Sequence, residues 1–122
     1  MRTQPVDTRI SFGYSHPLKT LFLKGKLPTV KYGIYGDKLT KDTVSLEHVQ
    51  PKSKGGKSVL SNYALASKRM NNLRGDKDIR EFLTPENLKR YCEQFIGVIV
   101  GDFDGTKYIH DLLKTINRLL NK

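Results

Sequence analysis

The sequence has 122 residues and carries 22 Lys and Arg against 12 Asp and Glu, which gives a formal net charge of +10. This length suits one domain, and 37% hydrophobic residues suffice for a small core, so intrinsic disorder of the whole chain is excluded. The longest apolar run, Phe95 to Val100 with a break at Gly97, is far shorter than the ~20 residues of a membrane helix. We therefore expect one domain, residues 1–122, without a membrane span.

The charge excess lies in the middle of the chain. Residues 1–51 carry a net charge of +4, residues 52–80 carry +6, and residues 81–122 are neutral. Such a concentration indicates a local surface for a polyanion, although a solvated lysine-rich loop explains the charge alone equally well. The last third of the chain is typical of a scaffold.

The first half of the chain predicts an irregular arm, two strands and a short helix. The first thirty residues are rich in Pro and Gly and leave room for one short helix at most, around the apolar residues 18–23. Residues 43–49 favour a strand, the stretch 51–56 a turn, and residues 63–66 a second strand. Ser67 is a candidate N-cap for a helix over residues 68–74 that Gly75 ends.

The second half predicts a helical scaffold at about 84–122, beside a core at about 33–75. Thr84, Pro85 and Glu86 start a helix that runs to about Phe95. The run 98–100 between two glycines fits an extension of this helix or a strand. Residues 107–120 carry an apolar stripe at helical spacing, which favours core packing over dimerisation. The predicted fold class is α+β.

Several patterns resemble functional motifs without meeting their requirements. The single cysteine, Cys92, excludes a disulfide framework and a multi-cysteine zinc site. The stretch 56–58 (Gly-Lys-Ser) lacks the first glycine of a phosphate-binding loop, and the acidic stretch 102–105 lacks the closing glutamate of a calcium loop and predicts a tight turn. We interpret His16 and His110 as structural or incidental.

Residues 45–75 contain a more informative set of side chains. Glu47 and His48 come at the end of the first strand, a glycine-containing basic loop follows, Asn62 precedes the second strand, and Asn71 lies on the short helix. Each residue by itself has an ordinary reading: a surface pair, a turn cap or an exposed helix residue. The order of these residues along the chain, and not any one of them alone, indicates a catalytic site.

This set can supply what phosphodiester cleavage requires. A neutral imidazole suits the activation of water at neutral pH, and a carboxylate with an amide oxygen suits Mg²⁺. Neighbouring residues on a regular strand point to opposite faces, so Glu47 and His48 can share a site only where the strand twists or ends. Asn71 and Arg74 lie one turn apart on the same helix face, which lets the guanidinium meet a phosphate.

In this arrangement the sequence resembles the HNH endonuclease family, whose ββα-metal core has the same succession of residues. The resemblance covers about residues 33–75. It implies that Glu47, where the family more often has aspartate, and Asn71 are the metal ligands. It further implies that His48 is the general base and that Asn62 is the central asparagine that orients the segment of His48. Arg74 matches the family's basic position before a glycine.

The sequence departs from the family at the zinc-binding cysteines. Many members carry two Cys-x-x-Cys knuckles, and the matching places here are residues 33–36 (Gly-Ile-Tyr-Gly) and 67–70 (Ser-Lys-Arg-Met). The chain therefore resembles a branch without structural zinc, which flanking helices stabilise instead.

The resemblance implies a metal-dependent DNA endonuclease that nicks or cuts both strands, with Mg²⁺ as cofactor and Mn²⁺ as an alternative. The nucleic-acid contacts expected from charge and motif are Lys52, Lys54, Lys57, Lys68, Arg69 and Arg74. The alternatives are a non-catalytic ββα module that binds DNA or RNA, and an interaction protein that dimerises through Leu112, Ile116 and Leu119. We expect DNA as partner, a monomer or weak homodimer, and a cytoplasmic or nucleoid-associated location, because no secretory signal pattern is present.

Overall fold

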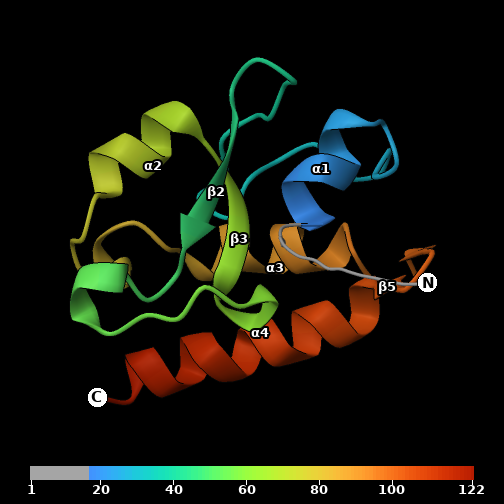
Figure 1. Ribbon diagram of the computed structural model, residues 1–122. Helices are drawn as coiled ribbons and strands as arrows, with labels where there is room; N and C mark the ends of the chain where they lie inside the picture. The colour runs from blue at the N-terminus through green and yellow to red at the C-terminus, as the bar shows by residue number, and fades with distance from the viewer. Residues whose placement is uncertain (1–16) are drawn as a thin grey trace.

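Two antiparallel strands and the helix that follows them form the centre of the structure. The computed structural model describes residues 17–122. Strand β2 (Val44–His48) pairs with β3 (Tyr63–Ser67), and helix α2 (Lys68–Arg74) begins directly after β3. Figure 1 shows α1 (Pro17–Leu23) and α2 on either side of this hairpin, with α3 (Pro85–Glu93) behind it and α4 (Gly105–Leu120) along its lower end. The described chain is a small α+β protein.

Short elements complete the connections. Three 3₁₀ turns span η1 (Lys52–Lys54), η2 (Leu60–Asn62) and η3 (Ile79–Glu81). A second hairpin joins β4 (Ile99–Val100) to β5 (Phe103–Asp104), so the last two residues of the ambiguous run 98–100 form a strand and the run does not extend the helix. Within residues 17–122, no helix combines the length and the apolar character that crossing a membrane requires.

Local capping signals explain why the predicted helices begin where they do. The Ser67 side chain accepts a hydrogen bond from the Met70 amide at 3.2 Å, and the Thr84 side chain accepts one from the Asn87 amide at the same distance. Gly75 ends α2 with a φ of 53°, a region that favours glycine. Asp104 caps α4, which therefore starts two residues earlier than predicted. The turn predicted at 102–105 is confirmed only at its start, because residues 103 and 104 form β5 and Gly105 begins α4.

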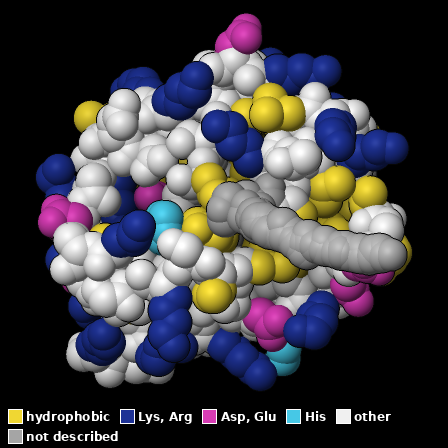
Figure 2. All heavy atoms as spheres, viewed as in Figure 1, with side chains coloured by type: hydrophobic (Ala, Val, Ile, Leu, Met, Phe, Trp, Pro, Cys, Tyr) yellow, Lys and Arg dark blue, Asp and Glu magenta, His cyan; other side chains and the backbone are white. Residues whose placement is uncertain are grey.

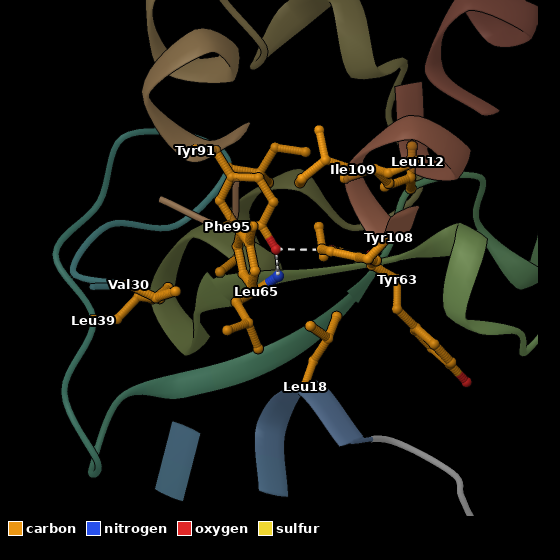
Figure 3. Close-up of a cluster of buried hydrophobic side chains, with 14 of the residues drawn as sticks. Leu18, Val30, Leu39, Tyr63, Leu65, Tyr91, Phe95, Tyr108, Ile109 and Leu112 are labelled. Atoms are coloured by element: carbon orange, nitrogen blue, oxygen red, sulfur yellow. Dashed lines mark hydrogen bonds between the residues drawn. The ribbon is translucent and has the colours of Figure 1, made fainter. Parts of the chain in front are cut away.

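Most of the apolar stripe of α4 lies in the core. Leu112 and Ile116 are fully buried, and Leu119 is half-buried against the same cluster. The cluster includes residues from Leu18 in α1 to Ile116 in α4 (Figure 3). The predicted irregular arm proves helical at Pro17–Leu23, while residues 1–16, including His16, lie outside the described part.

The outer edge of β3 is covered by partners from three distant segments. The Leu65 amide donates to the Tyr91 hydroxyl at 2.9 Å, and the Leu65 carbonyl accepts from the Ile34 amide at 2.9 Å. The Tyr108 hydroxyl donates to the Tyr63 carbonyl at 2.6 Å and also contacts the Tyr91 hydroxyl at 2.9 Å (Figure 3). Because a bare strand edge exposes unpaired backbone groups, this cover holds the small sheet in place.

Candidate functional site

The predicted site residues lie at the end of β2 where the strand meets its loop. In the register of the hairpin, His48 pairs with Tyr63 and Glu47 pairs with Ala64. Neighbouring positions alternate between faces, so the His48 ring packs edge-on against the Tyr63 ring at 4.8 Å, while the Glu47 side chain faces Tyr35 and Arg74. Adjacent in sequence, the two side chains therefore have separate surroundings.

His48 has the surroundings of a neutral imidazole. Its side chain is half-buried, and Nε2 lies 3.3 Å from the hydroxyl of the exposed Ser58. Burial lowers the pKa of His48 below its ordinary value, and the nearby charge of Lys52 lowers this pKa further. At neutral pH the ring is therefore mostly unprotonated, and it can accept a proton.

Asn62 fastens the loop between the two strands. Its side-chain oxygen accepts from the Gln50 amide at 2.8 Å, and its amide group donates to the carbonyls of Gln50 at 3.0 Å and Lys57 at 2.9 Å. The Val49 amide donates to the Asn62 carbonyl at 2.9 Å. These contacts cross the hairpin directly beside His48, as the orienting role expected of Asn62 requires.

Glu47 is a buried partner of Arg74 and does not face the surface. The carboxylate is 2% exposed, and its Oε2 accepts from the Tyr35 hydroxyl at 2.7 Å and from Arg74 Nη1 at 3.3 Å. Burial raises the pKa of Glu47 above its ordinary value, while the hydrogen bond from Tyr35 and the charge of Arg74 oppose this shift. Sequence reasoning missed Tyr35, because it lies twelve residues before Glu47 in a different segment.

Arg74 differs most from its expected position. We predicted a phosphate contact, but the side chain is 1% exposed, and its Nε and Nη1 donate to internal acceptors. Nε donates to the Lys77 carbonyl at 2.7 Å, and Nη1 also donates to the His48 carbonyl at 3.1 Å. Arg74 thus fixes the backbone of β2 to the end of α2 and is almost entirely buried, at the wall of a surface cavity.

Asn71 lies on the same side of the hairpin as Glu47 but makes different contacts. Its amide nitrogen donates to Ser45 Oγ at 2.8 Å and to the Leu46 carbonyl at 3.2 Å. A divalent ion shared by Glu47 and Asn71 would need an open carboxylate, and here that carboxylate already accepts two hydrogen bonds, one from a cation. Among the described residues, no group of three His, Cys, Asp or Glu could hold a metal ion. Both hydrogen bonds to Glu47 fall on Oε2, so a divalent ion at this carboxylate would compete with the ion pair to Arg74.

The predicted nucleic-acid contacts divide into two groups. Lys52, Lys54 and Lys57 are exposed on the loop that follows His48. Lys68 and Arg69 are also exposed, but they lie at the start of α2, where the Lys68 amide donates to the Thr43 carbonyl at the opposite end of β2. Figure 2, which has the same view as Figure 1, shows Lys and Arg side chains spread over the visible face of the molecule. The structure therefore places three exposed lysines on the loop beside His48, while the sixth predicted contact, Arg74, bonds to the His48 carbonyl from inside the protein.

The segments that match the zinc knuckles of the HNH family lie side by side. The Ile34 amide bonds to the Leu65 carbonyl, and the Ser67 amide donates to the Asp37 carboxylate. A side chain on Gly33 would meet the backbone of Leu65 and Ala66 at 3.0 Å, so the close approach requires glycine. In the part of the chain that the structure describes, hydrogen bonds and close packing join these segments.

Comparison of the chain with protein-family models, with curated proteins and with solved structures finds no match.

Proposed function

We propose that the protein is an endonuclease of the HNH type that hydrolyses DNA phosphodiester bonds with His48 as general base. One observation carries the proposal: the His48 imidazole, with its lowered pKa, lies partly accessible where a strand end, an asparagine-fastened loop and a lysine-rich surface meet. A positioned general base of this kind contributes ~100-fold to 10,000-fold to a rate. The surrounding lysines provide counter-charge for a phosphate.

The reaction follows from these side chains. A phosphate held beside Lys52 and Lys57 exposes its phosphorus to a water molecule at His48, and the neutral imidazole takes a proton from that water as it attacks. The bond from phosphorus to the 3′-oxygen breaks as the new bond forms, and the departing 3′-oxygen takes a proton from solvent, which leaves a 3′-hydroxyl and a 5′-phosphate. The Ser58 hydroxyl, 3.3 Å from Nε2, restricts the rotation of the ring. Because the active form is the neutral imidazole, the rate should rise with pH through a pKa below that of an ordinary histidine and then level off.

A second candidate function is a module that binds nucleic acid without cutting it. The Glu47 to Arg74 ion pair favours this alternative, since it removes the carboxylate from the metal site that the resemblance implies. The dependence on Mg²⁺ or Mn²⁺ thus stays a prediction from the resemblance. One experiment tests both whether the protein cleaves DNA and whether cleavage depends on a divalent ion.

The test incubates supercoiled plasmid with the wild-type protein, with His48→Ala and with His110→Ala, each in Mg²⁺, in Mn²⁺ and in EDTA. His110 is an exposed histidine on α4, so its variant is the matched control. We expect wild type and His110→Ala to nick or linearise the plasmid in Mg²⁺, and His48→Ala to lose at least ~100-fold of that rate. DNA binding by His48→Ala should be retained. Undiminished cleavage by His48→Ala, or no cleavage by wild type under any condition, would overturn the proposal. The second result together with measured DNA binding would support the binding module.

A further inference from the structure

Two surface cavities flank the loop that follows His48, and both are lined by cations. The first, between this loop, the segment after α2 and the end of α4, is lined by four exposed cations, Lys54, Lys77, Arg80 and Lys122, and by the buried Arg74. The second, between the same loop and α4, contains Lys57 and Arg118. Gln50 lines both cavities, so they are neighbours across a single residue. We call the six exposed cations Lys54, Lys57, Lys77, Arg80, Arg118 and Lys122 the cationic track.

The cationic track combines cations from the basic middle of the chain with cations from its last third, which has no net charge. Residues 81–122 have no net charge and were interpreted as scaffold, yet Arg118 and Lys122 belong to the track. Figure 1 shows the reason: α4 runs beneath the hairpin, and its C-terminal end comes below the loop between β2 and β3. The scaffold helix thereby extends the basic surface of the loop.

The track has a strongly positive local charge. Its six members are exposed, and the acidic residue that lines these cavities is Asp78. Asp78 pairs with Arg80 at 3.1 Å, while the other five members have no ion pair within residues 17–122. Clustered cations that lack acidic partners raise the local concentration of a polyanion and guide its approach.

The track borders the proposed catalytic residue on two sides. The first cavity is lined by Val49, Gln50 and Pro51, which follow His48 directly. The second is lined by Lys57 and Val59, on either side of the serine that contacts the His48 ring. A ligand that spans both cavities crosses Gln50, which is two residues after His48, although His48 itself lines neither cavity.

The lining of the track indicates what part of a nucleic acid it contacts. None of the described residues that line the two cavities is aromatic. Proteins that hold single strands usually stack exposed bases on aromatic side chains, whereas contacts from Lys and Arg to phosphates suit a duplex, whose bases are already stacked. The chemistry of the track therefore fits the sugar–phosphate backbone and not the bases.

We propose that the cationic track binds the phosphate backbone of duplex DNA, independently of base sequence, and that the C-terminal end of α4 supplies part of this contact. The assignment of the track as the substrate surface of a nuclease rests on the proposed function. The binding itself does not, because the track can hold a duplex whether or not His48 cuts it.

The experiment measures binding of a short fluorescent duplex, and of one of its single strands, by anisotropy in EDTA at several salt concentrations. The track variant is Arg118→Gln with Lys122→Gln. The control is Lys24→Gln with Lys89→Gln, which changes the net charge equally at exposed positions outside both cavities. Thermal melts followed by circular dichroism check that both variants fold.

We expect the track variant to bind the duplex about tenfold more weakly near ~0.1 M salt and to lower the slope of log K against log salt by about 2. The control should change affinity less than about twofold. Equal losses in both variants, or a single strand bound as tightly as the duplex, would overturn the proposal. If wild type fails to cleave plasmid while the track variant alone loses binding, the nuclease proposal falls and the track stands. If wild type cleaves plasmid while the track variant binds the duplex as tightly as wild type, the track proposal falls and the nuclease proposal stands.

Discussion

At the scale of single residues, the buried pair of Glu47 and Arg74 determines which groups are available for chemistry. A buried ion pair contributes little net stability compared with apolar side chains of similar size, but the loss of one partner leaves a costly unpaired charge. The two residues also share the Tyr35 hydroxyl, which lies 3.3 Å from Arg74 Nη1. Burial and the charge of Glu47 raise the pKa of Tyr35, so this hydroxyl stays a donor at every physiological pH. The Glu47–Arg74 pair is therefore a buried structural unit, and its arginine also holds the His48 carbonyl.

Removal of Arg74 should destabilise the protein in a pH-dependent way. We expect Arg74→Met to lower the free energy of unfolding by about 3–5 kcal/mol at neutral pH, because Glu47 is left buried and charged. The pKa of Glu47 is already raised by burial and rises further without Arg74, so its stability contribution is present at low pH and lost as pH increases through that pKa. The loss should hence be smaller near about pH 5 than near about pH 8, as measured by urea denaturation.

Arg80→Met is the matched control for this measurement. Arg80 pairs with Asp78 at 3.1 Å on the surface, with about half of each side chain exposed, so its loss should cost less than about 1 kcal/mol. Arg74→Met losing no more stability than Arg80→Met would contradict the buried role of Arg74.

At the scale of elements, the hairpin end depends on a single asparagine that holds a fourteen-residue connection between the strands. Asn62 makes three side-chain hydrogen bonds to the backbone of residues 50 and 57. Gly56 lies so close to the Gln50 carbonyl that a side chain there would clash with it. Asn62 consequently holds the loop that carries Lys52, Lys54 and Lys57 to residue 50 at its start. Within the loop, Gly56 packs directly against the Gln50 carbonyl.

Replacement of Asn62 should loosen this loop. Asn62→Ala removes three hydrogen bonds, each worth about 1 kcal/mol, and we expect a loss of about 2–4 kcal/mol in the free energy of unfolding. The exposed Asn72 on α2 offers a control, whose change to alanine should alter stability by less than about 0.5 kcal/mol. Hydrogen exchange at the Gln50 amide should accelerate in Asn62→Ala alone. Unchanged exchange at Gln50 would show that the asparagine does not hold the loop.

The elements themselves could largely be predicted because their signals are local. The strands at 44–48 and 63–67 and the helix at 68–74 agree with prediction to within a residue, since the cap of Ser67 and the turn residues mark their ends. The hairpin at 99–104 could not be chosen over a helix, because three β-branched residues between glycines satisfy both patterns until a partner strand is present.

At the scale of the whole molecule, buried tyrosines connect the layers that surround the hairpin. Tyr91 from α3 and Tyr108 from α4 are fully or almost fully buried and bond to each other and to the backbone of β3. Burial raises the pKa of both hydroxyls, so they remain protonated hydrogen-bond donors. Direct hydrogen bonds thus link α3 and α4 to the hairpin.

The fold should therefore be independent of metal ions. We expect the midpoint of thermal unfolding to be the same, within about 1 °C, in EDTA and in Zn²⁺, because direct hydrogen bonds and apolar packing hold the segments together. Tyr108→Phe, in contrast, removes the donor to the Tyr63 carbonyl and should cost about 1–3 kcal/mol, or several degrees in the midpoint. A large drop in EDTA would reveal a structural metal and contradict this account.

The sequence by itself determined the order and ends of the main elements, the basic loop and the candidate residues His48 and Asn62, because caps, turns and periodicity act over a few residues. Only the tertiary structure decided that Glu47 meets Arg74 and Tyr35, and that Arg118 and Lys122 join the lysines of the loop. These outcomes depend on which faces become buried when distant segments pack, and burial sets whether a charge is a surface ligand or an internal partner.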